Sequence, residues 1–191
     1  VDGFGRLAGV ITVDDVIDAM VEEQTEDVQR LGAVQPLDDP YFQAGFWNVA
    51  SKRVGWLVVL FVGEMFTGNA MRAYEPLISK VISLTVFLPL IISSGGNSGS
   101  QSATLITRAL AVGDVEIRDA MRVFLRELGQ GLVLGGCLGV IGLVRALFGN
   151  DGAMFAVVVA VSLVLVVLVG TVVGAMLPLL LRRVGVDPAV A

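Results

Sequence analysis

The sequence predicts an all-α multi-pass transmembrane bundle, preceded by a short α/β segment and a connecting helix. Three observations predict this fold class. Only 16% of the 191 residues are charged and 55% are hydrophobic, whereas a soluble domain carries about a quarter charged residues. Four long apolar stretches follow one another after position 50. In contrast, ten of the 18 acidic residues lie within the first 39 positions, together with only two arginines.

The N-terminal part is predicted to be soluble. Residues 7–11 are a short apolar run that is typical of a buried strand. Thr12 then caps a helix, with Asp15 at the spacing of a capping box. The helix is expected to end or bend near Gly32, before two prolines fix a linker. The predicted domains are an α/β segment at 1–21, a connecting helix with its linker at 22–50, and a membrane domain at 51–191.

The membrane domain is predicted to cross the bilayer four times. The last apolar stretch has 28 residues and no charge. As a helix it would be about 42 Å long, which exceeds a hydrocarbon core of about 30 Å, so it is expected to tilt or protrude. The four spans are expected at residues 54–71, 77–110, 128–148 and 154–181.

The placement of lysine and arginine predicts the orientation of these spans, because the cytoplasmic side carries the excess of positive charge. One side of the four spans has eight basic residues and the other has three. The acidic N-terminal segment, the 109–127 loop and the C-terminus are therefore expected to face the cytoplasm, with the spans in the inner (cell) membrane. The first side carries Lys52, Arg53, Arg108, Arg118, Arg122, Arg126, Arg182 and Arg183, and the second carries Arg72, Lys80 and Arg145.

The second span has a polar centre that lipid would not tolerate. It holds five serines, three glycines and two amides. Pro89 is expected to free a carbonyl and kink the helix, and Gly95 and Gly96 to leave carbonyls unshielded. These carbonyls and the amides of Asn97 and Gln101 are hard neutral oxygens that suit a hydrated Mg²⁺ or Ca²⁺ ion. The segment therefore predicts a pore lining, and the alternative is a polar helix–helix contact without an ion.

Carboxylates cluster on the predicted N-terminal helix. They are spaced three or four residues apart, so they share helix faces and repel one another. A bridging divalent cation would relieve this repulsion, and the alternative is a solvated acidic surface. Such a surface would repel nucleic acid, which is not expected as a partner. The candidate ligands are Asp15, Asp18, Glu23, Glu26 and Asp27.

No enzyme is predicted. Residues 96–99 match the Gly-x-Ser-Gly motif of rhomboid-type intramembrane proteases. A serine nucleophile needs a base, those proteases use histidine, and the chain has none.

Glycines recur at four-residue intervals on the third span (131, 135 and 139) and on the fourth (170 and 174). This spacing lets helix backbones approach closely and is typical of helix packing in a membrane. The single cysteine, Cys137, is expected to be a small buried side chain.

The order of motifs resembles that of the MgtE family of magnesium channels over nearly the whole chain. Residues 95–105, followed by Arg108-Ala109-Leu110-Ala111 and Asp114, resemble the family signature. Later segments at 123–127, 174–178 and 182–189 are similar to further family motifs. Residues 9–16 resemble the closing strand and helix of a CBS domain, and residues 22–27 resemble the start of the family's connecting "plug" helix.

The resemblance implies a homodimer with five transmembrane helices per subunit, a cytoplasmic N-domain and two CBS domains. It implies passive Mg²⁺ conduction that stops when intracellular Mg²⁺ binds between the plug helix and the cytoplasmic domains. The regulatory ligands implied are Asp15, Asp18, Glu23, Glu26 and Asp27, and the segment from Gly95 to Gln101 is implied to line the pore. Mg²⁺ is the expected ligand, and membrane lipid the expected surroundings.

The sequence departs from the family pattern at both ends. The N-domain, most of the CBS pair and the fifth helix, with the family's ion-selecting aspartate, are expected outside these 191 residues. Two alternatives stay open. A Na⁺- or H⁺-coupled secondary transporter is suggested by Glu64, an acid inside the first span. The other is a membrane-anchored CBS sensor without transport activity.

Overall fold

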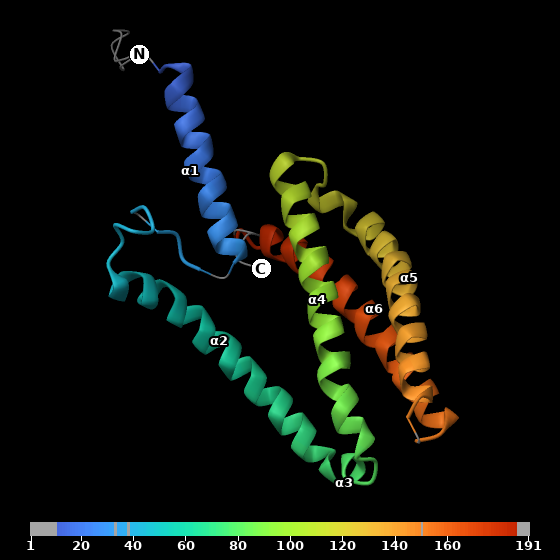
Figure 1. The fold of residues 1–191 in the computed structure, drawn as a ribbon. Helices are drawn as coiled ribbons and strands as arrows, with labels where there is room; N and C mark the ends of the chain where they lie inside the picture. The colour runs from blue at the N-terminus through green and yellow to red at the C-terminus, as the bar shows by residue number, and fades with distance from the viewer. Residues whose placement is uncertain (1–10, 33, 38, 150, 187–191) are drawn as a thin grey trace. The chain divides into compact units, whose positions relative to one another are not determined.

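The computed structural model describes residues 11–32, 34–37, 39–149 and 151–186, and all the regular structure there is helical (Figure 1). This confirms a helical membrane domain. The predicted strand at 7–11 falls almost entirely outside the described residues, and no strand occurs within them. The helices are α1 (Val13–Leu31), α2 (Phe46–Ala73), α3 (Glu75–Ile78), α4 (Ser83–Val112), the short 3₁₀ helix η1 (Ile117–Asp119), α5 (Ala120–Leu147) and α6 (Ala153–Arg183).

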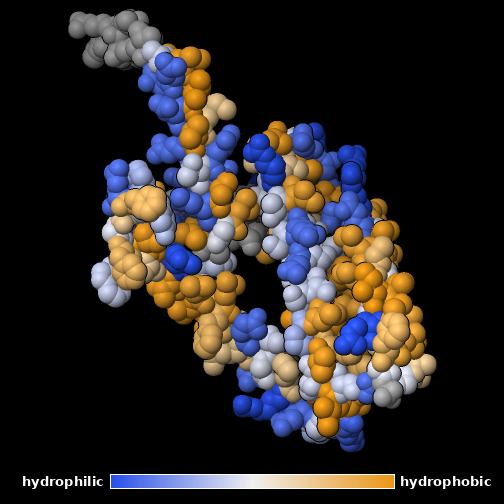
Figure 2. All heavy atoms as spheres, in the orientation of Figure 1, coloured by the Kyte–Doolittle hydropathy of each residue, from blue (hydrophilic) through white to orange (hydrophobic). Residues whose placement is uncertain are grey.

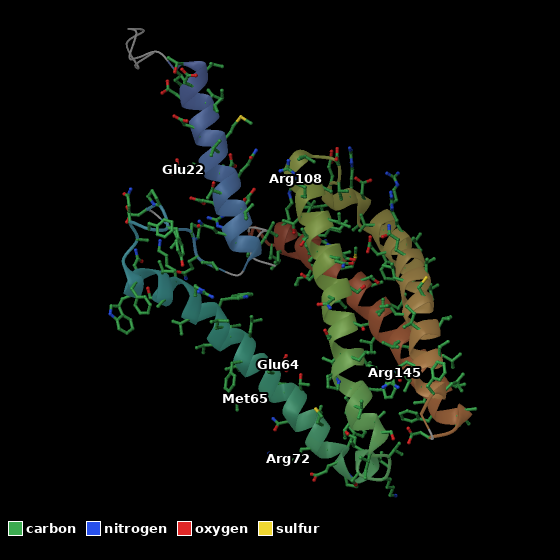
Figure 3. All side chains as sticks on the ribbon, in the orientation of Figure 1. Glu22, Glu64, Met65, Arg72, Arg108 and Arg145 are labelled. Carbon is green, nitrogen blue, oxygen red and sulfur yellow. The ribbon has the colours of Figure 1, made fainter. Side chains whose placement is uncertain are left out.

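The chain divides into two compact units, Val1–Glu64 and Met65–Ala191. The boundary falls inside α2, between the two adjacent residues labelled in Figure 3. The first unit holds α1, its linker and most of α2, and the second holds the remaining helices.

Helix α1 begins and ends where the sequence predicts. The Thr12 hydroxyl accepts from the Asp15 amide at 3.3 Å, and Asp15 Oδ2 accepts from the Thr12 amide at 2.7 Å, so the capping box is present. Gly32 is the C-terminal cap. The linker is tied back to α1, because the Leu37 amide donates to Gln29 Oε1 at 2.8 Å. No residue of α1 is buried within the chain.

In the part of the chain that the structure describes, three helical segments are long and apolar enough to cross a membrane: Phe46–Ala73, Ile117–Leu147 and Ala153–Arg183. These segments contain the first and fourth predicted spans and nearly all of the third. They identify the chain as a multi-pass membrane protein. Helix α4 is of similar length, with 30 residues, but its polar centre lowers its mean hydropathy.

The second predicted span, 77–110, is divided in the structure. A separate turn of helix, α3, precedes α4, and Pro76 lies in the first turn of α3. Proline is favoured there because the first helical amides have no intrahelical partner. Helix α4 itself is continuous through Pro89 and both central glycines, so the expected weakening of the helix at that point does not break it.

Helices α4 and α5 both pack along α6 (Figure 1). Two apolar clusters hold this bundle together, one towards each end. The first cluster contains Phe87, Ile91, Ala146, Ala156, Val159 and Leu163, and the second contains Ile106, Leu110, Val123, Ala175 and Leu179. At the end with the second cluster, Arg182 of α6 also links to α4, because its Nη1 donates to the Leu110 carbonyl at 2.6 Å.

Glycines make the close approaches between these clusters, as their spacing predicts. Helices α4 and α6 touch backbone to backbone: a Cβ on Gly99 would lie 3.0 Å from the Gly170 carbonyl oxygen, and one on Gly174 would overlap the Gly99 carbonyl. On α5, a Cβ on Gly135 would lie 2.9 Å from the Val164 carbonyl oxygen. The packing interpretation of the glycines is therefore confirmed.

Cys137 is exposed on α5, so the prediction of a buried cysteine is wrong. Helix α5 packs on α6 through its glycine face, and Cys137 lies away from that face. In a membrane protein an outward-facing apolar residue contacts lipid, so hydrophobicity alone does not predict burial inside the bundle.

Candidate functional site

Helix α4 of the second unit has an exposed polar face. Residues at intervals of three and four share one face of a helix, and the exposed positions of α4 follow this spacing. Figure 2 shows pale and blue surface along α4 beside the orange surface of α5. The exposed residues of this polar face are Pro89, Ser93, Gly96, Asn97, Ser100, Gln101, Thr104 and Arg108.

The amides of the polar face are largely free to bind a ligand. Asn97 Nδ2 donates to Ser93 Oγ at 3.4 Å, a long contact that leaves the amide oxygen uninvolved. Within the described residues, the Gln101 side chain has no hydrogen-bond partner. These two amides lie about one helical turn apart, so a hydrated cation passing along α4 would meet their oxygens in succession.

The structure brings together four of the five predicted pore-lining residues and separates the fifth. Pro89, Gly96, Asn97 and Gln101 are on the exposed face. Gly95 is buried on the opposite side, where a Cβ would lie 3.2 Å from the Val166 carbonyl oxygen of α6. In the structure, Gly95 therefore allows α4 to pack closely against α6.

The predicted regulatory carboxylates all lie on α1, and all are exposed or half-exposed. Glu26 pairs with Arg30 at 3.0 Å. Among the described residues, no three acidic, cysteine or histidine side chains are grouped closely enough to hold a metal ion. In the described part of the chain, the α1 carboxylates therefore do not form a metal-binding group by themselves. The residues concerned are Asp15, Asp18, Glu23, Glu26 and Asp27.

The carboxylate of Asp15 is hydrogen-bonded within the capping box of α1. The Thr12 side chain and backbone both donate to it, at 2.6 and 2.7 Å, and these hydrogen bonds lower the Asp15 pKa below its ordinary value. Hydrogen bonds to a carboxylate favour its charged form. These bonds therefore favour the ionised form of Asp15 at the N-terminus of α1, where negative charge also stabilises the helix.

A second polar group lies on the buried side of α4, and the sequence prediction missed it. Ser102 Oγ donates to Glu127 Oε2 of α5 at 2.8 Å, and both residues are buried. Ser98, one turn earlier, is also buried. Glu127 was predicted to be in the 109–127 loop, but α5 begins at Ala120. Its spacing of four residues from Gly131 would have placed it on the packing face of α5.

Glu64, the acid that suggested ion coupling, is exposed near the middle of α2 (Figure 3). The described residues offer it no hydrogen bond or ion pair. Its neighbours along the helix are apolar.

The fold is that of a multi-pass membrane protein in which one long helix of the bundle, α4, has an exposed polar face. A family model described as MgtE, a divalent cation transporter, matches residues 88–191. The chain belongs to the MgtE family. The resemblance seen in the motifs is thus confirmed, and members of this family are transporters and not enzymes.

Three curated relatives, each named magnesium transporter MgtE, match almost the whole chain. The protein of Thermus thermophilus is 47% identical over 189 residues, which cover 99% of this chain and 42% of the relative. The Enterococcus faecalis protein is 32% identical over 97% of this chain and 40% of its own length. The Bacillus subtilis protein is 29% identical over 97% of this chain and 41% of its own length. The chain therefore spans about two fifths of these relatives.

Proposed function

We propose that the full-length protein conducts Mg²⁺ passively across the cell membrane, and that the polar face of α4 lines the path. The observation that carries this proposal is the exposure of Asn97 and Gln101 at the centre of a helix in a membrane bundle. Lipid cannot satisfy such amides. Water, an ion or another protein surface can.

The chemistry of the polar face favours a hydrated divalent cation. Mg²⁺ prefers oxygen ligands and gives up its water reluctantly. Neutral amide and hydroxyl oxygens can hydrogen-bond to that water without holding the ion too tightly to leave. The names of the three relatives, all magnesium transporters, support Mg²⁺ as the ion.

The same argument supports α4 as a fourth span and a homodimer as the functional assembly. A lone polar face would contact lipid, whereas two copies facing each other about a two-fold axis would enclose a hydrophilic path. Arg108 and Arg145 lie at opposite ends of the α4–α6 bundle (Figure 3), as the predicted sides require. We place the Arg108 end and the acidic N-terminal segment in the cytoplasm.

We further propose that intracellular Mg²⁺ closes this path by binding the acidic residues of α1. The carboxylates are accessible, and Asp18, Glu23 and Asp27 have no basic partner among the described residues. Mg²⁺ bridging them to acidic groups elsewhere in the full-length protein would favour the closed state by binding it preferentially. At low Mg²⁺ the carboxylates repel and the closed state loses population.

These proposals are tested by Mg²⁺ flux into proteoliposomes that contain the full-length protein. Asn97→Ala is expected to lower flux about tenfold, since an amide oxygen is lost from the path. Ser94→Ala is the matched control on the same helix, because the Ser94 hydroxyl already donates to the Leu90 carbonyl at 2.7 Å. Equal flux in Asn97→Ala and the parent would remove Asn97 from the path.

The regulatory proposal has its own measurement in the same vesicles. The triple variant Glu23→Ala, Glu26→Ala, Asp27→Ala is expected to conduct at internal Mg²⁺ concentrations that close the parent. A triple variant that still closes at the parent's Mg²⁺ concentration would contradict the regulatory site and leave the conduction proposal standing.

Ion coupling through Glu64 is the second candidate function, favoured by the exposed carboxyl on α2 among apolar residues. A coupled transporter would need a Na⁺ or pH gradient for net Mg²⁺ movement, and Glu64→Gln would abolish that need. Passive conduction predicts flux without either gradient, and no effect of Glu64→Gln on the driving force.

A further inference from the structure

Glu127 is a buried carboxylate with no positive partner. Its exposed fraction is 5%, and it accepts a hydrogen bond from Ser102 Oγ at 2.8 Å. None of the described residues forms an ion pair with it. The nearby Arg122 pairs with Asp119 at 3.1 Å instead. A buried charge without compensation is costly, so a positive ligand is wanted here.

Ser98 supplies a second, independent sign of a missing ligand. Its exposed fraction is 7%, and its hydroxyl is the one buried side-chain oxygen without a hydrogen-bond partner among the described residues. Two other hydroxyls of the bundle are satisfied: Ser94 donates to the Leu90 carbonyl at 2.7 Å, and Thr171 donates to the Leu168 carbonyl at 2.9 Å. An orphaned hydroxyl in a native core calls for an explanation.

The two serines belong to one face of α4. Ser98 and Ser102 are four residues apart on a continuous helix, so they are separated by about 6 Å along its axis. Both are buried, and the later one reaches Glu127. The buried side of α4 thus carries two hydroxyls, one of which reaches the Glu127 carboxylate, and it lies opposite the polar face that carries Asn97 and Gln101.

A cavity reaches this group at Glu127, although neither serine lines it. It has a volume of about 420 Å³ and lies between the C-terminal half of α4, the loop around η1 and the start of α5. Its wall contains apolar residues such as Ile106, but also Gln130 and Glu127. The volume is sufficient for several water molecules, each occupying about 30 Å³. A hydrated ion can therefore reach Glu127 without crossing the glycine contacts between α4 and α6.

The charges around the cavity decide the valence of the ligand. Asp114, Asp119, Arg122 and Arg126 also line it, and these two acids and two bases balance. Together with Glu127, the formal charge of these lining residues is −1. One monovalent cation neutralises it, whereas a divalent ion would leave an uncompensated positive charge in a region of low dielectric constant.

We propose that Glu127, Ser102 and Ser98 bind a small monovalent cation, such as Na⁺, that enters through this cavity. The carboxylate supplies the charge, and the serine hydroxyls supply neutral oxygen ligands. The site is separate from the proposed Mg²⁺ path, because it lies on the buried side of α4. Occupancy would hold α4 to α5 through Glu127, and so stabilise the setting of the helix that carries Asn97 and Gln101.

The test uses thermal unfolding of the full-length protein in Mg²⁺-free buffer, so its outcome does not depend on transport. Na⁺ is compared with choline at constant ionic strength. Na⁺ is expected to raise the melting temperature in a saturable way, as a ligand of the native state does. Glu127→Gln keeps the shape and the acceptor for Ser102 but loses the charge, and should abolish the saturable rise. Glu64→Gln removes a different membrane glutamate and should retain it.

Ser98→Ala separates a ligand role from a packing defect. If the hydroxyl binds the cation, this variant should weaken the apparent Na⁺ affinity about tenfold, the typical cost of a lost contact to a charged group. A Ser98→Ala protein that melts higher with unchanged Na⁺ dependence would overturn the proposal. So would a saturable Na⁺ effect that persists in Glu127→Gln, or no difference between Na⁺ and choline in the parent. Direct binding of ²²Na⁺ to the parent and to Ser98→Ala gives the same answer if Glu127→Gln does not fold.

Discussion

The two faces of α4 have similar residues and different surroundings. Gly96, Asn97 and Gln101 lie on the exposed face, and Gly95, Ser98 and Ser102 lie on the face that packs inside the bundle. Each face thus has a glycine and polar side chains, within the same eight positions from Gly95 to Ser102. Only the contacts with α5 and α6 distinguish them.

This difference shows that polarity in a membrane helix has two separate uses. On the exposed face, polar groups without internal partners are available to water and ions. On the buried face, small residues allow the backbones to approach, and Ser102 forms a hydrogen bond across to α5. Neighbouring residues of one motif should therefore respond to substitution in opposite ways.

The largest expected effect contrasts Gly95 with Gly96. Gly95→Leu would drive a side chain into Val166 of α6, whereas a Cβ on Gly96 meets nothing within 4 Å. We expect Gly95→Leu to be lost as aggregate during detergent extraction, measured by size-exclusion chromatography with fluorescence detection. Gly96→Leu should elute as the parent does, yet conduct Mg²⁺ at least about tenfold more slowly, because an apolar side chain now occupies the polar face. The opposite pattern would mean that the two faces have been exchanged.

An intermediate effect is expected on α5, where two adjacent glycines differ in the same way. A Cβ on Gly135 would lie 2.9 Å from the Val164 carbonyl oxygen, and one on Gly136 would contact nothing within 4 Å. Gly135→Ala should destabilise the protein by about 1–3 kcal/mol, the usual cost of overpacking. Gly136→Ala should change the unfolding free energy little. Chemical denaturation in detergent micelles measures both, and equal values would show that α5 and α6 can separate without loss.

The smallest expected effect of a substitution is on α1. None of its residues is buried, so a substitution there disturbs no packed contacts. Thr12→Val removes the hydroxyl that is the main cause of the lowered Asp15 pKa, so this pKa should rise towards its ordinary value. Because the folded pKa is depressed, the cap contributes stability above the unfolded pKa of Asp15, and the contribution disappears as pH falls through the folded pKa. A carboxyl NMR titration measures the shift. Thr25→Val removes a hydroxyl that bonds only the Val21 carbonyl and should leave Asp15 unchanged.

Much of the architecture was predictable because its causes are local. The capping box at Thr12 and Asp15 fixes the start of α1 through neighbouring atoms, and Gly32 ends it. The uncharged stretch of α6 is a helix because hydrocarbon leaves the backbone no other hydrogen-bonding partners. The glycine spacing on α5 and α6 predicts close packing because residues four positions apart lie on the same face of a helix.

The sequence alone therefore determined the helices, the membrane class, the family motifs and the set of polar residues at the centre of α4. The tertiary structure decided which polar residues face outward, that Gly95 packs against Val166, and that Glu127 reaches Ser102 across 25 positions of sequence. Burial of one helix face depends on the rotation of that helix against its neighbours. This rotation is set by contacts between distant segments, which no local pattern in α4 specifies.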